Sequence, residues 1–364
     1  MPPYLAGRES ELRLIRNQLA RLQQAAGGSD AIIYGPRGNG KTALMESVLR
    51  EARATGIATL KFTSADIESK EWLAGHLSVV PSWLRLLSGV TLPRIGVRTR
   101  DAPGGMISNA LARRARKRAL VVAVDEAHVH AHEAGRTLLN AVQRCRTDQV
   151  PVMLLLAGTP DLPRHLNSMD ASFWDRCKIL PLGLLQPDAA GDAIRIPLEA
   201  AGRSIEEDAL ARVIVESHGY PYFLQLWGEL LWTDIADAGR PASLADMDRV
   251  RPLFESARNT YYRNRYVELE RATLAGVAAK LSLVFTESGQ RTNLEVNERI
   301  RLALESEGRD SDIESVMTAR DRLHDLGYIW SAGGEARHSF RPGIPSLMLY
   351  VARSEDIDVG SAGE

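Results

Sequence analysis

The fold is decided by the stretch AIIYGPRGNGKT, which runs from residue 31 to residue 42. Its first four residues, 31–34, are mostly apolar and predict a short buried strand. The rest fits the spacing G-x-x-x-x-G-K-[ST] of a loop that joins a strand to a helix and cradles phosphate. Glycines let backbone N–H groups turn inward, and a lysine and a hydroxyl complete the donors. The predicted phosphate-binding residues are Gly35, Pro36, Arg37, Gly38, Asn39, Gly40, Lys41, Thr42 and Ala43.

Strand and helix patterns alternate on both sides of this loop. Apolar residues at three- and four-residue spacing predict helices over 9–25 and 41–55. Further strands are predicted at 57–62, 119–124, 150–157 and 178–182. This alternation predicts an α/β fold with a mainly parallel sheet that is covered on both faces.

The pattern changes after residue 185. Helices are predicted at 188–201, 206–217, 221–238, from 241 to about 283 with a break, 293–306 and 311–326. A β-hairpin over 328–340 follows, so the end of the chain is interpreted as a winged helix-turn-helix. The predicted domains are a core (1–185), a helical lid (186–240), a linker helix with the winged helix (241–353) and a disordered tail (354–364).

Two acids follow the strand predicted at 119–124. Asp125 at the tip of a buried strand can hold Mg²⁺ together with the Thr42 hydroxyl, and Glu126 can polarise an attacking water. Without the loop, two solvated acids would be the simpler interpretation. With it, the sequence predicts binding and hydrolysis of ATP, with Mg²⁺ as the metal and Lys41 at the β- and γ-phosphates.

These motifs resemble those of the AAA+ and STAND ATPases, and the arrangement of lid and winged helix is similar to the origin-recognition initiators and transposition regulators. The resemblance implies a five-stranded sheet of order five-one-four-three-two. It also implies that Gly7 and Arg8 border the adenine, that Pro221 packs near it, and that Thr159 meets the γ-phosphate. By the same resemblance Arg176 is an arginine finger that serves a neighbouring subunit, in a nucleotide-dependent homo-oligomer.

The sequence departs from the AAA+ pattern in one respect. At the start of the third lid helix, where a sensor arginine is expected, stand Tyr222, Phe223 and Gln225. This favours the STAND side of the resemblance, although the chain lacks the long repeat region that is typical of STAND proteins.

Composition narrows the classes of function. The 364 residues include 45 Lys and Arg against 46 Asp and Glu, a net charge of −1, which excludes a dominantly basic nucleic-acid coat. Two cysteines, Cys145 and Cys177, exclude a disulfide framework or a thiolate zinc site. The longest strongly apolar stretch, 150–157, is far below the ~20 residues of a membrane helix. We therefore expect a cytoplasmic protein without a membrane span.

Two regions are candidates for a DNA contact. The basic cluster is Arg94, Arg98, Arg100, Arg113, Arg114, Arg116, Lys117 and Arg118, with Asp101 as the one acid among them. It is either a patch for nucleic acid or an acidic partner, or in part the cationic end of a helix. The second candidate is the helix at 311–326, through Arg320, Arg322 and His324, where an intramolecular or protein-binding role is the alternative.

The interpretation that follows is an ATP-hydrolysing switch that controls a DNA transaction such as replication, transposition or genome defence. The alternative is a STAND-type signalling switch that hydrolyses slowly and binds a protein partner through its winged helix. A third class is a DNA-binding protein that holds nucleotide only structurally. A phosphate-contacting DNA interface would lose affinity steeply as salt rises, which separates these classes.

Overall fold

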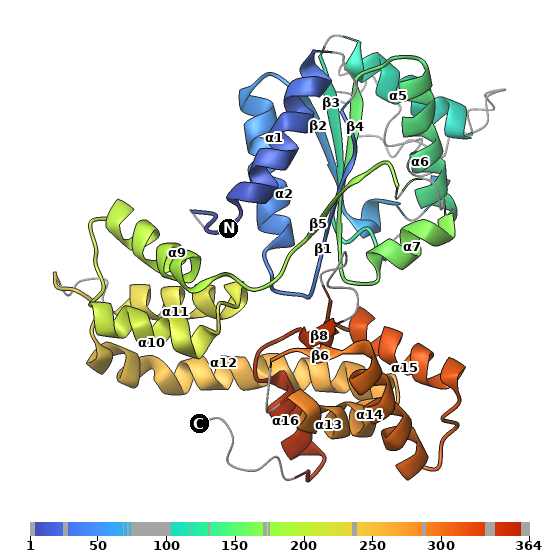
Figure 1. Cartoon of the computed structure of the whole chain (residues 1–364). Coiled ribbons are helices and arrows are strands. Elements are labelled where there is room, and N and C mark those ends of the chain that lie inside the picture. The colour runs from blue at the N-terminus through green and yellow to red at the C-terminus, as the bar shows by residue number, and fades with distance from the viewer. Residues whose placement is uncertain are drawn as a thin grey trace, which may run out of the picture.

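The structure is a computed structural model of the chain (Figure 1). It describes residues 4–24, 28–67, 69–70, 73, 103–116, 118–129, 132–169, 173, 175–234, 239–285, 289–331 and 339–357. Arg94, Arg98, Arg100, Lys117, the turn of the predicted hairpin and residues 358–364 of the predicted tail lie outside these ranges.

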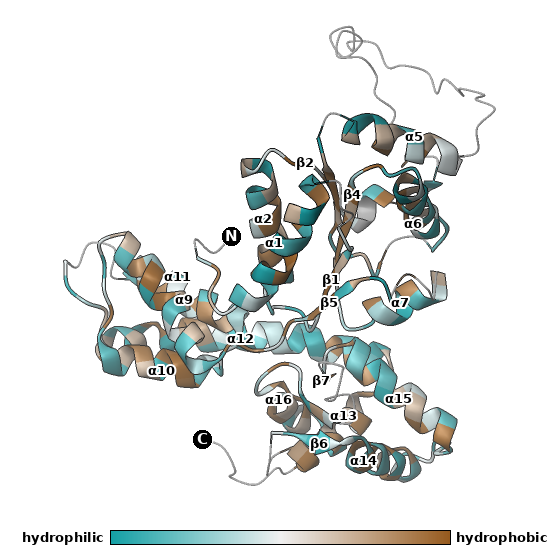
Figure 2. Ribbon diagram, turned by 45° about the horizontal axis from the view of Figure 1, so that its top comes forward, coloured by the Kyte–Doolittle hydropathy of each residue, from teal (hydrophilic) through white to brown (hydrophobic). Residues whose placement is uncertain are grey.

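A five-stranded parallel sheet forms the core. Its strands are β1 (Ala31–Tyr34), β2 (Ala58–Phe62), β3 (Leu120–Val124), β4 (Val152–Gly158) and β5 (Lys178–Pro181). They lie in the order β2-β3-β4-β1-β5, and every neighbouring pair is parallel. This confirms the expected order five-one-four-three-two. Figure 2 shows β1 and β4 as hydrophobic along their length, as expected for strands buried on both faces.

Helices cover both faces of the sheet. On one face lie α1 (Glu9–Gln23) and α2 (Lys41–Ala54), and on the other α5 (Pro103–Ala115), α6 (His132–Thr147) and α7 (Leu162–Met169) (Figure 1). Successive residues of a strand point to opposite faces. Accordingly, Ile33 packs in the apolar cluster with α1 and α2, whereas Ile32 packs in the cluster with α5 and α6. This sheet fixes the position of the loop that follows β1.

The predicted lid is a group of three helices, α9 (Pro187–Ala200), α10 (Glu207–Ser217) and α11 (Pro221–Asp234). They pack around Phe223, Trp227 and Leu231. The long helix α12 (Leu244–Arg271) begins at a capping box formed by Ser243 and Asp246 and connects the lid to the C-terminal domain (Figure 1).

The predicted long helix is broken at residues 272–274, where Thr273 adopts a left-handed φ of 55°. The C-terminal domain then contains α13 (Ala275–Phe285), α14 (Asn293–Ser306), α15 (Ile313–Asp325) and α16 (Leu347–Ser354). Strands β6 (Arg291–Thr292), β8 (Ser339–Pro342) and β7 (Ile329–Trp330) form an antiparallel sheet in that order. The pairing of β7 with β8 agrees with the predicted hairpin; β6 and α16 were not predicted.

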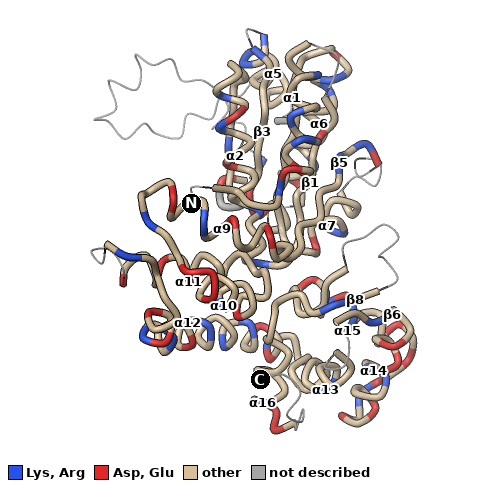
Figure 3. Tube along the Cα trace, turned by 60° about the vertical axis from the view of Figure 1, so that its left-hand side comes forward, with Lys and Arg blue, Asp and Glu red and all other residues tan. Residues whose placement is uncertain are grey.

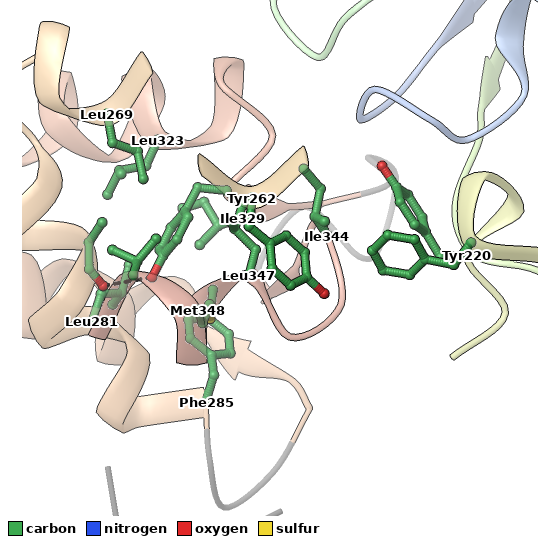
Figure 4. Packing of buried hydrophobic residues seen from close by; sticks show 14 of the residues in the cluster. Tyr220, Tyr262, Leu269, Leu281, Phe285, Leu323, Ile329, Ile344, Leu347 and Met348 are labelled. Atoms are coloured by element: carbon green, nitrogen blue, oxygen red, sulfur yellow. Dashed lines mark hydrogen bonds between the residues drawn. The ribbon is translucent and has the colours of Figure 1, made fainter. Parts of the chain in front are cut away.

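The core of the C-terminal domain is shared with α12. Figure 4 shows Tyr262 and Leu269 of α12 beside side chains from α13, α15 and α16, such as Leu281, Leu323 and Leu347. The Tyr262 hydroxyl donates a hydrogen bond to the Pro345 carbonyl at 2.7 Å. A movement of α12 would therefore carry the whole domain with it.

The C-terminal domain also docks on the carboxyl edge of the large sheet (Figure 1). Trp330 is buried in the apolar cluster of the core, edge-to-face with Tyr34 at a centroid distance of 5.5 Å. Arg164 of α7 donates two hydrogen bonds, of 2.8 and 3.0 Å, to the carboxylate of Asp325 on α15. The loop after β1 thus lies where core, lid and C-terminal domain meet. Among the described residues, no helix is long and apolar enough to cross a membrane.

Candidate nucleotide-binding site

The loop after β1 is tightly curled, and two of its glycines are required by close contacts. A Cβ at Gly35 would lie 2.4 Å from the Leu182 carbonyl oxygen, and one at Gly38 would lie 2.3 Å from the Tyr220 hydroxyl. Gly38 and Gly40 also have left-handed φ angles of 80° and 84°. Gly40 is the N-cap of α2, so the backbone N–H groups that begin this helix face the loop. The predicted residues 35–43 therefore form one continuous cradle.

Lys41 spans the cradle. Its Nζ donates hydrogen bonds to the carbonyl oxygens of Gly35 (2.9 Å) and Pro36 (2.8 Å). Burial lowers the pKa of Lys41 to about 8, and the positive charge of Arg37 adds to this effect. An anion in the cradle would stabilise the charged ammonium and raise the pKa again, so phosphate binding and protonation of Lys41 reinforce each other.

Thr42 and Asp125 come together beside the cradle. The Thr42 hydroxyl donates to the carboxylate of Asp125 at 3.3 Å. Asp125 follows β3 and is only 8% exposed, with Lys61 Nζ 3.6 Å from its second oxygen. A hydroxyl and a carboxylate are the hard oxygen donors that Mg²⁺ prefers, so these two predicted residues fit the ion.

Glu126 lies next to this pair with an exposed side chain. Its backbone has a left-handed φ of 50°, and its N–H donates to the Asp125 carboxylate at 3.1 Å. A non-glycine residue in this conformation is strained, and such strain persists where the surroundings impose it, often at functional sites. The strained turn holds Glu126 at the carboxyl edge of the sheet, accessible to a water molecule.

Thr159 lies directly after β4, whose last residue, Gly158, accepts a hydrogen bond from the Gly35 N–H at 3.3 Å. The Thr159 N–H donates to Nδ1 of His128 at 3.4 Å, and its hydroxyl donates to the Asp161 carboxylate. Burial lowers the pKa of His128. Neither His128 nor Asp161 was predicted to belong to the site, and the His128 ring turns inward to Thr159.

A largely apolar cavity of about 610 Å³ opens from the cradle between core and lid. Two of the residues expected near a base, Arg8 and Pro221, line it. The buried Arg8 guanidinium donates to the carbonyl oxygens of Asn39 (3.3 Å) and Gly183 (2.7 Å), and burial lowers its pKa. Gly7 packs instead against α9. The cavity has the size and character of a site for a flat aromatic ring.

The lid contacts the cradle through a residue that the sequence did not single out. The Tyr220 hydroxyl donates to the Arg37 carbonyl and lies 2.8 Å from the Tyr261 hydroxyl of α12. Tyr220 precedes Pro221, which was noted for the base, but a contact across 183 residues leaves no local signal.

Arg176 is not brought to the cradle. It precedes β5 and so lies at the amino ends of the parallel strands, whereas Lys41 lies at their carboxyl ends. Its exposed guanidinium donates to the Gln143 side chain at 3.3 Å. Any role for it at a cradle would have to be in another copy of the chain.

A second cavity, of about 570 Å³, lies on the other side of the cradle, between Arg37 and the C-terminal domain. Thr159, Asp161 and His128 form its wall on the core side. Its wall on the opposite side comes from the end of α12 and from α15. The two cavities thus flank the cradle, one beneath the lid and one beside the C-terminal domain.

Comparison with known proteins agrees with this geometry. Residues 4–155 match the family described as "AAA ATPase domain". No curated protein matches the chain. Among solved structures the chain is similar to the ADP form of the ORC2 protein of Aeropyrum pernix, with a TM-score of 0.57 and 20% identity over 98% of this chain and 96% of that one.

Two further structures are similar over nearly their whole length. A variant of RuvB from Thermotoga maritima has a TM-score of 0.53 at 14% identity, covering 98% of this chain and 96% of that one. Cdc6p from Pyrobaculum aerophilum has a TM-score of 0.50 at 16% identity, covering 97% and 96%. At these identities the likeness is one of fold. Together with the family match, it confirms the expected AAA+ resemblance and supports ATPase activity.

Proposed function

We propose that the chain is a switch that binds ATP in the cradle, hydrolyses it with Mg²⁺, and couples nucleotide state to the positions of the lid and the C-terminal domain. The base enters the apolar cavity, Lys41 and the loop N–H groups hold the phosphates, and Glu126 takes a proton from the attacking water. Thr42 and Asp125 would hold Mg²⁺, which neutralises phosphate charge when bound. Thr159 would meet the terminal phosphate.

One observation carries this proposal: a single loop contacts all three parts of the chain. The Arg37 carbonyl accepts a hydrogen bond from the Tyr220 hydroxyl of the lid. Pro36 packs on the C-terminal domain, where a Cβ at Gly327 would lie 3.5 Å from the Pro36 Cβ. A ligand that shifts the loop by a fraction of an ångström would therefore alter both contacts, because packed interfaces do not deform continuously.

The direct test is Lys41→Ala. Loss of a charged donor to phosphate costs ~1.5–3 kcal/mol, so ATP affinity should fall roughly ten- to a hundredfold in calorimetry. Lys280→Ala is the control, since Lys280 bonds Ser306 on the far side of the C-terminal domain. Unchanged ATP affinity in Lys41→Ala would mean that the cradle does not bind phosphate.

DNA is the output that we propose for the switch. Arg113, Arg116 and Arg118, at the end of α5 and the approach to β3, are exposed. The helices α13 to α15 followed by β7 and β8 support a winged helix, but two of the three side chains expected to read DNA there are engaged otherwise. Arg320 is bound to Asp321 at 2.8 Å, and His324 is stacked on Trp330.

Reversing Arg113 and Arg116 to Glu should abolish DNA retention in a low-salt shift assay and leave ATP hydrolysis intact. The matched control is Arg195→Glu in the lid, where Arg195 pairs with Glu207 at 3.1 Å. Binding by the unmodified chain should weaken steeply as salt rises. If the double reversal retains DNA as the unmodified chain does, these arginines are not the contact.

A second output, a protein partner, is favoured by the exposed face of α14 and α15. Leu302, Ile313 and Met317 are 42%, 80% and 43% exposed. Acidic residues adjoin them, and Figure 3 shows both signs of charge interspersed along α14. If the chain binds no DNA at low salt, the products of neighbouring genes should be tested for co-purification that Ile313→Asp abolishes.

We also propose that Arg176 acts in a neighbouring copy of the chain. Its exposed guanidinium can bind two phosphate oxygens at once, and known arginine fingers contribute ~10³–10⁵ in rate. Arg176→Ala and Lys41→Ala should each be nearly inactive, and their mixture should partly recover if subunits exchange, which a tagged pull-down establishes. Wild-type hydrolysis by Arg176→Ala alone would refute the assignment.

A further inference from the structure

The cavity of about 570 Å³ beside the C-terminal domain is lined by three arginines from three separate parts of the chain. Arg37 belongs to the cradle, Arg271 ends α12, and Arg322 lies in α15. All three side chains are exposed. Among the residues that the structure describes, their guanidinium groups have no hydrogen-bond or ion-pair partner.

The acids that share this cavity are already engaged. Asp161 accepts the Thr159 hydroxyl, and Asp325 accepts two hydrogen bonds from Arg164. Glu268 pairs with Arg265 at 2.9 Å. The cavity therefore has more cationic hydrogen-bond donors than its own acids satisfy, which suits an anion.

The position of the cavity identifies the anion. Thr159, which we propose to face the terminal phosphate, lines the same cavity as Arg37. The charges of Arg37, Glu126 and Lys41 all act on His128, another lining residue, so cavity and cradle adjoin. The loop N–H groups and Lys41 would hold a phosphate chain between the two cavities. Because one end of that chain leads to the base in the apolar cavity, its free end, the terminal phosphate, would face the second cavity.

The helix α15 is held in a position that presents Arg322 to this space. Arg322 and Asp325 are three residues apart and so lie on one face of the helix. Asp325 is bound by Arg164 of the core at 2.8 and 3.0 Å. This contact fixes the helix against α7 while Arg322 points to the cavity.

We propose that Arg322 and Arg271, together with Arg37, bind the terminal phosphate of ATP held in the cradle of the same chain. The proposal rests on the proposed function, since it takes nucleotide in the cradle as given. A guanidinium presents a planar fork that matches two phosphate oxygens. Because ADP lacks this phosphate, the C-terminal domain contacts ATP directly and ADP not at all, which makes it the part of the chain that distinguishes the two nucleotides.

Calorimetry with a non-hydrolysable ATP analogue and with ADP, each with Mg²⁺, tests this on the full chain. Arg322→Ala and Arg271→Ala should each weaken the analogue roughly tenfold or more and change ADP affinity less than twofold, since each removes a charged hydrogen bond to one phosphate. Arg322→Lys, which keeps the charge but loses the fork, should fall between. Arg320→Ala is the matched control on the same helix, because Arg320 bonds Asp321 instead.

The outcomes separate the two proposals. If the unmodified chain binds neither nucleotide, the proposed function fails and this inference fails with it. If the chain binds both and Arg322→Ala and Arg271→Ala keep the wild-type ratio of the two affinities, only this inference is overturned. A parallel loss of analogue and ADP would also overturn it, because the arginines would then support the fold of the cradle rather than contact the terminal phosphate.

Discussion

The cradle separates two cavities of nearly equal volume, about 610 and 570 Å³, whose walls are opposite in character. The first, beneath the lid, is lined by side chains such as Ile194, Leu224 and Trp232. The second, beside the C-terminal domain, is lined by arginines and acids. An apolar wall binds a flat ring by burial, whereas a charged wall responds to the charge of what enters it.

If ATP binds as we propose, this difference divides the work of nucleotide recognition. Burial of the base contributes equally to ATP and ADP, so the lid side gives affinity without discrimination. Contacts to the terminal phosphate exist only with ATP, so the charged side gives discrimination. We propose that the chemistry belongs to the charged side as well, because Glu126 and Thr159 lie at that end of the cradle.

The largest expected effect is on turnover. Glu126→Gln keeps the shape of the side chain and loses the base, so ATP hydrolysis should fall ~10²–10⁴-fold while ATP affinity stays unchanged. Steady-state rates and calorimetry measure the two quantities. Glu133→Gln is the control, since Glu133 pairs with Lys70 away from the cradle. A normal rate in Glu126→Gln would place the base elsewhere.

Two tryptophans, one on each side of the cradle, give the next test of the comparison between the two sides. Trp330 is buried between core and C-terminal domain, so Trp330→Ala should cost about 3–5 kcal/mol of stability in denaturant unfolding. Trp232 lines the apolar cavity and is 40% exposed. Trp232→Ala should lower affinity for ATP and ADP alike and leave stability nearly unchanged. Equal losses of stability in the two variants would contradict the assignment of Trp330 to the domain interface and of Trp232 to the nucleotide cavity.

The smallest effect is a pH dependence of nucleotide binding. With the pKa of Lys41 near 8, the free chain holds the charged ammonium below pH 8 and loses it above. Bound phosphate raises this pKa, so affinity should be level below pH 8 and fall ~10-fold per unit above it. Lys41→Arg stays charged throughout and should bind without that slope. A flat profile in the unmodified chain would mean that Lys41 takes up no proton when nucleotide binds, which would contradict this coupling.

The sequence predicted what depends on neighbours along the chain. The loop, Asp125 with Glu126, and the helix 293–306 follow from local spacing, and the strand order followed from the family that these motifs resemble. Contacts between distant segments could not be predicted in this way. Tyr220 on Arg37 and Trp330 in the core depend on how the lid and the C-terminal domain dock. Arg322, a candidate DNA contact by sequence, lines the second cavity beside the cradle for the same reason.

The central claim is that nucleotide in the cradle is coupled to the C-terminal domain, and hydrogen exchange tests it most directly. Exchange should be compared in Glu126→Gln loaded with ATP and with ADP, in peptides over 326–331 and 339–345, where Gly343 bonds Tyr328 at 3.0 Å. We predict different protection of these peptides in the two nucleotides. Equal protection in both, with the cradle peptide protected by each nucleotide, would show that the domain does not respond to nucleotide state.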